Sequence, residues 1–296
     1  MRLLVTGRHG QVARSLADVA GKHSELELMF LARPELDLEQ PGSFAAAIEQ
    51  HRPDVVINAA AYTAVDQAEA EPERARRINA EAAGEGAVAA ARIGAGFVQL
   101  STDYVFDGQA SGAWREDALV GPLSEYGRSK LKGEEQVRAA GGEHVIVRTS
   151  WVVSQFGRNF VGTMMNAARE RDVLTVVDDQ RGCPTSALDL ARGLLVMVGH
   201  WRSGERVGVG ETYHLAGTGE TSWFGLAAFV MQCCREIGLP SAEVRPIRTA
   251  DWPAPARRPM NSVLDSSKFA RDFGFTMPDW RRSVRKIVER LATGRT

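Results

Sequence analysis

The sequence predicts an α/β protein in which a doubly wound parallel sheet is joined to a smaller α/β lobe toward the C-terminus. Three observations lead to this fold class. Short apolar runs alternate with helical patterns, the first run passes directly into a glycine turn, and Tyr126 and Lys130 stand one helical turn apart in a later stretch. Alternating strand and helix patterns are typical of a parallel sheet covered by helices on both faces.

The composition is that of an ordinary globular protein. The chain has 296 residues, 44% of them hydrophobic and 25% charged, which suits one large α/β domain or two lobes. The net charge of −1 provides no basic field for nucleic acid or for a membrane surface. The three cysteines, Cys183, Cys233 and Cys234, form neither a disulfide framework nor a zinc-binding spacing.

The chain carries no recognisable targeting or spanning segment. No uninterrupted apolar run reaches transmembrane length. The first residues run directly into a strand and a glycine turn, which is too short and too interrupted for a signal peptide. We therefore expect a cytoplasmic protein, in keeping with its sparse cysteines.

Residues 2–6 form the first expected strand, and a glycine turn follows at once. Gly7 permits the tight turn, and Gly10 lets the backbone approach a pyrophosphate at the N-terminus of the next helix. Ala13 takes the third glycine position and still permits close packing of helix on strand. The pattern indicates a Rossmann-type dinucleotide site, although an ordinary strand-to-helix turn has the same glycines. The residues expected at the cofactor here are Gly7, Gly10, Gln11 and Val12.

The second expected strand, residues 26–31, ends at Ala32-Arg33-Pro34 without the acidic residue that would hold the ribose 2′-hydroxyl of NAD. Arg33 could instead face the 2′-phosphate of NADP, which favours NADPH and leaves NADH as the alternative. A solvated loop arginine explains Arg33 equally well. Asp37 and Leu38 follow at a place suited to the adenine.

The third expected strand, residues 53–58, follows a helix over 43–50 and ends in Ala59, Ala60 and Ala61. Small residues at the carboxyl end of a parallel strand leave room for a ligand, and they also permit close packing under a helix. The pattern then predicts one or two helices over 67–93 and a fourth strand over 96–100.

Thr102 is expected just past the end of the fourth strand, where its hydroxyl could bond a reacting carbonyl oxygen or could simply cap a turn.

A loop over 108–125 leads to the helix that carries Tyr126 and Lys130, before a fifth strand over 144–148. Residues four apart share one helix face. An ammonium beside a phenol lowers its pKa, which would make Tyr126 an acid or base near neutral pH. A solvated helix face is the competing interpretation.

The later chain continues the alternation but is expected to form another lobe. We assign residues 1–150 and roughly 185–216 to the nucleotide-binding lobe, and residues 151–184 and 217–296 to a substrate-binding lobe. The active site should lie between them, at the carboxyl ends of the strands. The further elements expected are helices over 159–171, 186–199, 223–237 and 280–292, strands over 173–177 and 213–217, and loops over 180–185 and 251–259.

Taken together, these motifs resemble the extended short-chain dehydrogenase/reductases, and within them the dTDP-4-dehydrorhamnose reductase family, over nearly the whole chain. The most specific is Thr102-Asp103-Tyr104-Val105-Phe106-Asp107-Gly108. The other matching segments are Thr6-Gly7-x-x-Gly10-Gln11-Val12, Asn58-Ala59-Ala60-Ala61-Tyr62-Thr63-Ala64-Val65-Asp66, Tyr126-Gly127-x-Ser129-Lys130, Arg148-Thr149-Ser150-Trp151-Val152, Asn159-Phe160-Val161, Asp179-Gln180-x-Gly182-x-Pro184-Thr185 and Arg258-Pro259-x-x-Ser262-x-Leu264-Asp265.

The resemblance implies that NADPH, or alternatively NADH, delivers hydride to the C4 ketone of dTDP-4-dehydro-L-rhamnose. It implies that Tyr126 donates a proton to the carbonyl oxygen and that Thr102 positions this carbonyl and stabilises the developing oxyanion. Lys130 would lower the pKa of Tyr126 and hydrogen-bond the nicotinamide ribose. The expected partner is therefore a small nucleotide-sugar substrate.

Three more residues match substrate positions of the family. Asp103 and Trp151 match positions beside the sugar, and Arg258 is placed to bind the substrate pyrophosphate, for which a planar guanidinium is suited. Core packing is the competing interpretation for Trp151, and a surface ion pair for Arg258.

One departure from the family concerns magnesium. Some members bind Mg²⁺ at a dimer interface through glutamates, and the corresponding positions here are Ser15 and Leu188, with Asp189 adjacent. Serine and leucine are poor ligands for a hard cation. The sequence therefore argues against a magnesium-bridged dimer and leaves a monomer or another homodimer open.

Other activities of the same fold remain as alternatives. A 4,6-dehydratase would require an Asp-Glu pair after the threonine, but Tyr104 follows Asp103. A 4-epimerase must hold NAD tightly, which the absent acid after the second strand disfavours. A reductase of another 4-keto sugar nucleotide stays open. So does a non-catalytic NADP-binding regulatory subunit of the methionine adenosyltransferase type, although Thr102, Tyr126 and Lys130 favour catalysis.

Overall fold

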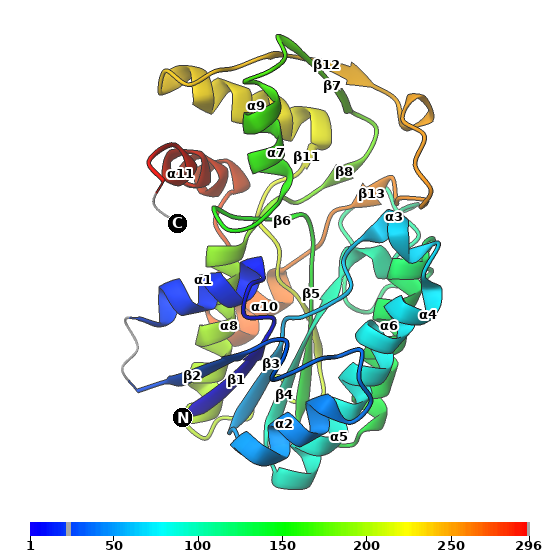
Figure 1. Cartoon of the computed structure of the whole chain (residues 1–296), viewed down its shortest axis with the longest axis vertical. Coiled ribbons are helices and arrows are strands. Elements are labelled where there is room, and N and C mark those ends of the chain that lie inside the picture. The colour runs from blue at the N-terminus through cyan, green and yellow to red at the C-terminus, as the bar shows by residue number, and fades with distance from the viewer. Residues whose placement is uncertain (22–24, 295–296) are drawn as a thin grey trace.

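Six strands form one parallel sheet in the lower half of the molecule as drawn in Figure 1. The structure is a computed structural model that describes residues 1–21 and 25–294. In sheet order the strands are β10 (Thr212–His214), β5 (His144–Thr149), β4 (Gly96–Thr102), β3 (Val55–Asn58), β1 (Arg2–Thr6) and β2 (Glu27–Leu31). The chain reverses direction across the sheet between β1 and β3. Ligands of open α/β sheets bind at such a switch point, beyond the carboxyl ends of the strands.

Helices cover both faces of this sheet because its strands are apolar on both sides. Leu3 and Val5 of β1 point to one face, where they share a buried cluster with Leu16 and Leu194, whereas Leu4 joins the cluster on the other face. Such two-sided burial is typical of parallel strands. The helices on the first face are α1 (Gln11–Ala20) and α8 (Ala187–Arg202), and those on the second are α2 (Ser43–His51), α5 (Ala82–Ile93) and α6 (Glu125–Ala139).

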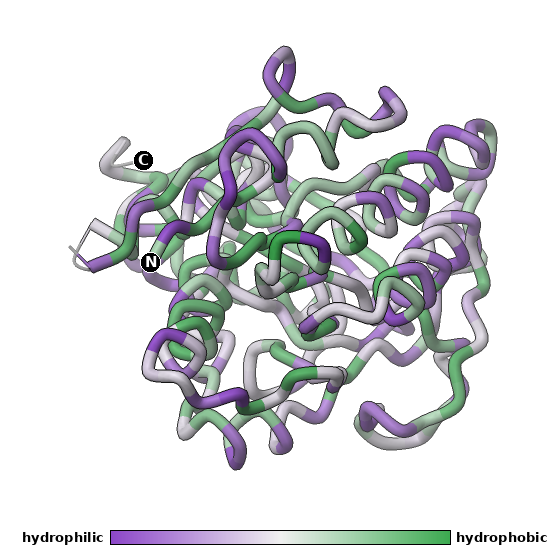
Figure 2. The backbone as a smooth tube through the Cα atoms, turned by 90° about the horizontal axis from the view of Figure 1, so that it is seen from below, coloured by the Kyte–Doolittle hydropathy of each residue, from purple (hydrophilic) through white to green (hydrophobic). Residues whose placement is uncertain are grey.

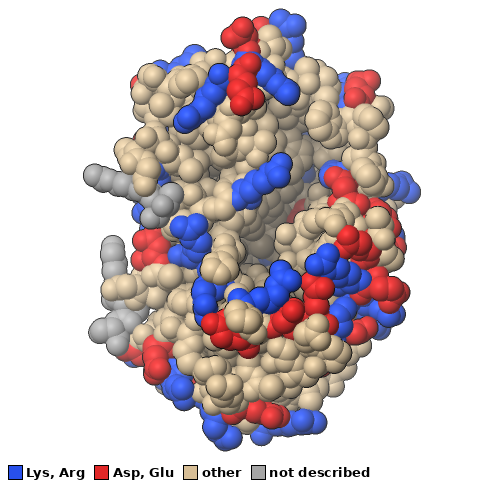
Figure 3. Space-filling view, viewed as in Figure 1, with Lys and Arg blue, Asp and Glu red and all other residues tan. Residues whose placement is uncertain are grey.

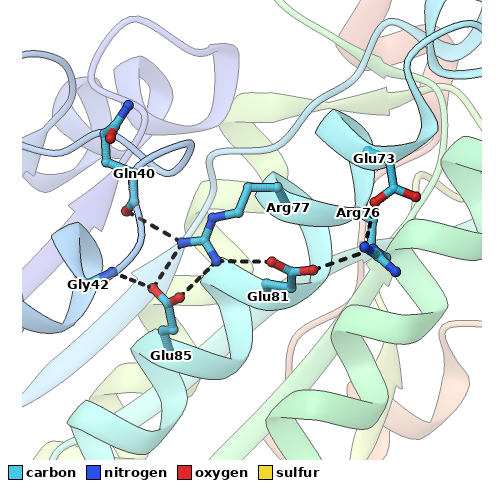
Figure 4. A network of polar contacts seen from close by, with 7 residues as sticks. All are labelled: Gln40, Gly42, Glu73, Arg76, Arg77, Glu81 and Glu85. Carbon is cyan, nitrogen blue, oxygen red and sulfur yellow. Dashed lines mark hydrogen bonds and ion pairs between the residues drawn. The ribbon is translucent and has the colours of Figure 1, made fainter.

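The helical stretch after β3 contains a π turn. A short helix, α3 (Val65–Ala68), precedes a continuous run made of α4 (Pro72–Arg76), the π turn Arg77–Glu81 and α5. Arg77 donates hydrogen bonds of 2.8 and 3.0 Å to Glu85, which also accepts from the backbone of Gly42 at the start of α2 (Figure 4). These contacts tie the π turn to the neighbouring helix. Turns of this kind occur often at functional sites.

The upper half of the molecule is a second α/β layer (Figure 1). Its helices bury one apolar cluster that includes Val161, Val230 and Val284. The helices are α7 (Phe160–Ala167), α9 (Trp223–Glu236) and α11 (Trp280–Ala292). The strands pair as β7 (Val173–Val177) with β12 (Glu243–Ile247), β6 (Val152–Val153) with β9 (Thr185–Ser186), and β8 (Arg181–Gly182) between β11 (Thr221–Ser222) and β13 (Asn261–Ser262).

The predicted parallel α/β fold is confirmed, and several element boundaries differ from the expectation. The expected loop over 180–185 contains β8 and the first residue of β9, and the helix expected over 159–171 ends at Ala167. Thr102 is the last residue of β4 rather than a residue beyond it. Strand β12 and helix α10 (Ser267–Phe273) carry no strong local pattern and were not expected.

Helix α10 lies against the large sheet's edge although it comes late in the chain. The rings of Phe269 and Phe273 lie 5.8 and 5.1 Å from the ring of Tyr213 in β10. The division into two lobes by residue range stays a prediction, and α10 shows that late residues also build the core around the large sheet. Peripheral helices alternate between hydrophilic and hydrophobic residues along their length (Figure 2). In the described part of the chain, no helix has both the length and the apolar character needed to cross a membrane.

Candidate active site

The carboxyl ends of the sheet strands face the second layer, and Figure 3 shows a hollow between the two halves with cationic side chains at its rim. Thr102 and Asp103 lie at this end of β4, and the first turns of α6 bring Tyr126 and Lys130 beside them. Helix α6 begins where it does because the Ser124 hydroxyl accepts a 3.2 Å hydrogen bond from the Gly127 amide. The topology thus gathers the predicted catalytic residues in one place.

The Thr102 hydroxyl lies close enough to the Tyr126 phenol to lower the pKa of the phenol, although burial outweighs this effect. The Thr102 hydroxyl also accepts a 3.2 Å bond from the Tyr104 amide and donates a 3.0 Å bond to the carboxylate of Asp103. Because these contacts come from backbone and side chain alike, the hydroxyl oxygen is held in one place. A group placed between Tyr126 and Thr102 would meet two hydroxyls at once, which is the arrangement needed to bind and protonate a carbonyl oxygen.

Burial shifts the pKa of both Tyr126 and Lys130. It raises the pKa of Tyr126 to about 12, and the nearby Thr102 hydroxyl opposes this only in part. Lys130 is itself buried, which lowers its pKa to about 8, and its ammonium donates a 2.7 Å hydrogen bond to the Leu100 carbonyl. Burial is the largest influence on the Tyr126 pKa in this structure, and the lowering expected from Lys130 stays a prediction. At neutral pH Tyr126 keeps its proton and can act as an acid.

Asp103 is fully enclosed beside this pair. Burial raises its pKa to about 6, opposed by hydrogen bonds with Ser262 and Thr102. Ser262 belongs to β13, so the second layer contributes directly to the site. One carboxylate oxygen of Asp103 has no partner among the described residues, which leaves an acceptor for a ligand.

The π turn contributes a residue that sequence reasoning missed. The Asn79 amide donates a 2.9 Å hydrogen bond to the Ser129 hydroxyl, which in turn donates 2.8 Å to the Tyr126 carbonyl. Asn79 also pairs with both backbone groups of Tyr62. It therefore holds the catalytic turn of α6 against the segment after β3. Its only sequence signal is an asparagine in an otherwise Ala/Glu/Arg-rich helix.

Trp151 lies in the second layer's half of the site in an unusual backbone conformation. Its φ of 45° is positive, which is rare for a bulky residue and often marks a functional position. Its indole stacks on Trp223 with ring centroids 3.5 Å apart and planes 9° from parallel. Phe160 continues the cluster 4.7 Å from Trp223. The stacking shows that Trp151 has a packing role, and its place beside the sugar stays a prediction. Trp223 was not expected from sequence.

Arg258 lies in the loop before β13, and its side chain extends toward the site. It donates a 2.7 Å hydrogen bond to Asp66, which lies beyond β3, and it also bonds the side chain of Tyr104. Tyr104 in turn meets the Tyr126 ring edge to face at 5.6 Å. Arg258 thus forms the ion pair considered as its alternative role, but with a partner at the site rather than on a remote surface.

A second cavity of about 200 Å³ lies at the carboxyl ends of β1, β2 and β3. Gly7 has a φ of 82°, and a Cβ there would come within 3.2 Å of Ala60, so only glycine lets the chain pass. Of the residues predicted to bind the cofactor, those that line this cavity are Gly7, Arg33, Asp37, Leu38, Ala60 and Ala61.

The other predicted cofactor residues lie around rather than in this cavity. The Gly10 amide bonds the Gly7 carbonyl at 2.7 Å, which shapes the turn before α1. Gln11 donates 3.3 Å to the Val152 carbonyl and accepts 2.8 Å from Ser154, so it joins α1 to the second layer. Val12 and Ala59 are both partly buried against the core cluster of the large sheet. Arg33, which does line the cavity, has an exposed side chain whose guanidinium lies 3.5 Å from the Glu39 carboxylate.

The two positions where some family members hold magnesium, Ser15 and Leu188, are packed inside the protein. Ser15 and Leu188 are buried in α1 and α8, and Asp189 accepts hydrogen bonds from Arg192 and Ser283 at 2.5 and 2.6 Å. Within residues 1–21 and 25–294, no group of three or more His, Cys, Asp or Glu side chains is placed to hold a metal ion.

Comparisons with known proteins agree with this geometry. The family model described as "RmlD substrate binding domain" matches residues 1–293. The chain is 42% identical to the dTDP-4-dehydrorhamnose reductase of Sinorhizobium fredii, covering 97% of both chains, and 37% identical to that of Escherichia coli K12, covering 99% of both. A crystal structure of a dTDP-4-dehydrorhamnose reductase from Clostridium acetobutylicum superposes with a TM-score of 0.90 at 36% identity, covering 99% of this chain and all of that one. The crystal structure of the Bacillus anthracis reductase in complex with NADP superposes with a TM-score of 0.87 at 33% identity, covering 97% of this chain and 98% of that one.

Proposed function

We propose, from the premise that this chain belongs to the dTDP-4-dehydrorhamnose reductase family, that it reduces the C4 ketone of dTDP-4-dehydro-L-rhamnose to give dTDP-L-rhamnose. NADPH, when bound, supplies the hydride for such a reduction. The observation that carries the proposal is the pair of neighbouring hydroxyls, Thr102 and Tyr126, at the end of β4, between the second layer and the cavity beside Gly7.

The reaction needs a proton at the ketone oxygen as negative charge develops there. Tyr126 keeps its proton at neutral pH because burial raises its pKa to about 12, so the acid is present before the reaction starts. When the ketone binds, the Thr102 hydroxyl would turn its proton from Asp103 to the same oxygen and so orient the carbonyl. Lys130 carries most of its charge at pH 7, since its pKa is about 8, and this charge stabilises the phenolate left by proton transfer.

The nucleotide half of the cofactor fits the cavity lined by Gly7, Ala60 and Ala61 because no side chain stands in the way of a close backbone approach. Arg33, at the edge of that cavity, is assigned to the 2′-phosphate that distinguishes NADPH from NADH. Glu39 accompanies it and would be partly displaced by the phosphate.

Replacing Arg33 with alanine should raise the KM for NADPH about fivefold, because one exposed charge-assisted contact is lost. The KM for NADH should stay within twofold, since NADH has no 2′-phosphate. Steady-state kinetics with both cofactors measure this. Arg245→Ala, in β12 and paired with Glu243, is the matched control. Equal effects on the two cofactors would show that Arg33 does not discriminate between them.

For the sugar nucleotide, we assign Asp103 and Trp151 to the sugar ring and Arg258 to the diphosphate. The unpartnered oxygen of Asp103 can accept from a sugar hydroxyl. The Trp151 indole presents a flat apolar surface that its stacking on Trp223 keeps in place.

Gly182→Ala tests the placement of Trp151. A Cβ at residue 182 would lie 2.5 Å from the indole, so the ring must move. We expect kcat/KM for the nucleotide sugar to fall about tenfold, because a small misplacement at the substrate is costly. NADPH affinity, measured by fluorescence titration, should be unchanged. An unaltered kcat/KM would remove Trp151 from the substrate site.

The deciding experiment follows the loss of reduced-nicotinamide absorbance when purified protein receives NADPH and dTDP-4-dehydro-L-rhamnose. Ketone-dependent oxidation establishes the reductase. Binding of NADPH without turnover points to a regulatory binder, and turnover of a different 4-keto sugar nucleotide changes the substrate. A cytoplasmic location and a monomeric or homodimeric state remain predictions.

A further inference from the structure

We propose that Asp66 is a positioning residue that fastens residues 248–260, called here the strap, to the β3 side of the site and thereby aims Arg258 at the diphosphate of the nucleotide sugar. The proposal rests on the proposed function, since it concerns the same substrate. The sequence motifs assign no role to Asp66. The strap runs from the end of β12 to the start of β13 and descends beside α3 (orange in Figure 1).

The strap is anchored at three separate points, one of which is a 2.8 Å hydrogen bond from the Arg181 amide of β8 to the Met260 carbonyl. At its start, the Thr249 hydroxyl and amide donate bonds of 2.6 and 2.9 Å to Asp179, and Gln180 donates 3.0 Å to the Thr249 hydroxyl. At its end, Asp66 accepts 3.1 Å from the Ala256 amide and 2.7 Å from Arg258. The first anchor lies within the second layer. The second crosses to the segment after β3, so Asp66 connects the two halves of the molecule.

Between these anchors the strap has little else to hold it. Within the described chain, residues 250–255 make hydrogen bonds only inside the strap, such as the one from the Trp252 amide to the Thr249 carbonyl. The Trp252 side chain is 56% exposed. Arg258 is therefore placed by the anchors at its own end of the strap, the bonds to Asp66 and the bond to Met260, rather than by packing of the middle of the strap.

The contacts of Arg258 leave donors free in a fixed direction. Asp66 takes one Nη2–H, and Nη1 donates 3.2 Å to the Ala256 carbonyl within the strap. A guanidinium has five N–H donors, so others remain for phosphate oxygens. The hydrogen bond from Arg258 lowers the pKa of Asp66, which keeps the carboxylate ionised at neutral pH. One oxygen of this carboxylate accepts from Arg258 and the other from the Ala256 amide, so the carboxylate is itself held in place while it accepts from the guanidinium.

Tyr104 lies between Arg258 and the predicted catalytic residue Tyr126. Tyr104 bonds Arg258 and packs edge to face on Tyr126. Positioning by Asp66 and competition by Asp66 predict opposite results. If Asp66 holds Arg258 ready, removing its charge weakens binding of the diphosphate. If Asp66 competes with the diphosphate for Arg258, removing its charge strengthens binding.

The test is a double-mutant cycle with dTDP, which carries the nucleotide and diphosphate but no ketone, measured by calorimetry. Asp66→Asn keeps an acceptor for the Ala256 amide and removes only the charge. We expect it to weaken dTDP binding about three- to tenfold, the equivalent of one oriented hydrogen bond. In an Arg258→Ala background the same change should have no further effect, because Asp66 acts through Arg258. With the full substrate, KM should rise and kcat should stay within twofold.

Unchanged or tighter dTDP binding in Asp66→Asn, or effects of the two substitutions that simply multiply, would overturn the proposal. Asp251→Asn, an exposed acid within the strap, is the matched control and should leave dTDP binding unchanged. Trypsin gives a readout independent of the substrate, since it cuts after the exposed Arg257. Cleavage should be several-fold faster in Asp66→Asn.

Failure of the proposed function looks different. If the wild type binds dTDP but leaves the ketone unreduced, the reductase assignment is wrong. The double-mutant cycle of dTDP binding still tests the role of Asp66 in that case. If the wild type binds no dTDP, the nucleotide assignment falls, and the trypsin comparison decides. Equal cleavage rates would then contradict the Asp66 anchor, and faster cleavage of the variant would support it.

Discussion

Replacing Tyr126 with phenylalanine should lower kcat for ketone reduction about a thousandfold, the usual scale for loss of a positioned general acid. The phenol is the proton donor nearest the expected oxyanion, and its raised pKa keeps it protonated throughout the neutral range. Phenylalanine preserves the ring and its edge contact with Tyr104. The fold and the cofactor site should therefore be intact, and the loss should lie in the chemical step.

The measurement is single-turnover oxidation of NADPH in the presence of saturating ketone, together with NADPH binding by fluorescence. Tyr104→Phe is the matched control, because it removes a neighbouring hydroxyl that bonds Arg258 rather than the reacting oxygen. We expect the control to change KM more than kcat. If Tyr126→Phe retained a tenth of wild-type kcat, another group would have to supply the proton.

Glu134→Gln should lower the free energy of unfolding by about 3–5 kcal/mol, because it breaks a buried ion pair and leaves a buried arginine uncompensated. Glu134 has no exposed surface, and Arg148 bonds both of its oxygens at 2.8 and 2.7 Å. Ser101 adds a 2.6 Å bond to the same carboxylate. Helix α6 is thus tied to β4 and β5 beside Thr102.

Urea denaturation measures this loss, with Glu135→Gln as the control on the next residue of the same helix. Glu135 is half exposed and, among the described residues, pairs only with Lys132, at 2.8 Å, so its replacement should cost less than about 0.5 kcal/mol. A cost of under about 1 kcal/mol for Glu134→Gln would mean that the buried pair contributes little.

The same variant should shift the pH dependence of activity. Glu134 raises the pKa of Lys130, opposing the burial that lowers it to about 8. Without that carboxylate the Lys130 pKa falls further, so the ammonium loses its proton closer to neutral pH. The alkaline limb of kcat should therefore move to lower pH. A limb that stays in place would indicate that activity does not depend on the charge of Lys130.

Local patterns were sufficient to predict the parallel sheet and the placement of Thr102, Tyr126 and Lys130. Each strand of β1, β3, β4 and β5 is a short apolar run, and the carboxyl ends of parallel strands meet at one edge. Helical spacing then places Tyr126 and Lys130 on one face of α6. These inferences need only neighbouring residues and a common rule of topology, which is why a single sequence supports them.

The second layer was harder to predict because its pairings are distant in sequence. Strand β8 takes partners from β11 and β13, each only two residues long, so no periodicity marks them. Trp151 likewise stacks on Trp223, and no local sequence pattern in either segment predicts this contact. Such elements exist because tertiary contacts hold them, and local propensity alone would not form them.

Electrostatics at the site also depended on the folded structure. The residue types suggested that Lys130 would acidify Tyr126, but the amount of water excluded from a side chain is a property of its whole surroundings. Burial raises the pKa of Tyr126, and Lys130 bonds the Leu100 carbonyl. Asp66 and Arg258 meet only because the chain folds the strap onto the segment after β3. The sequence alone was therefore enough for the fold class, the family and the meeting of Thr102, Tyr126 and Lys130 at one end of the sheet, whereas protonation and the contacts of Arg258 and Trp151 follow from packing between distant segments.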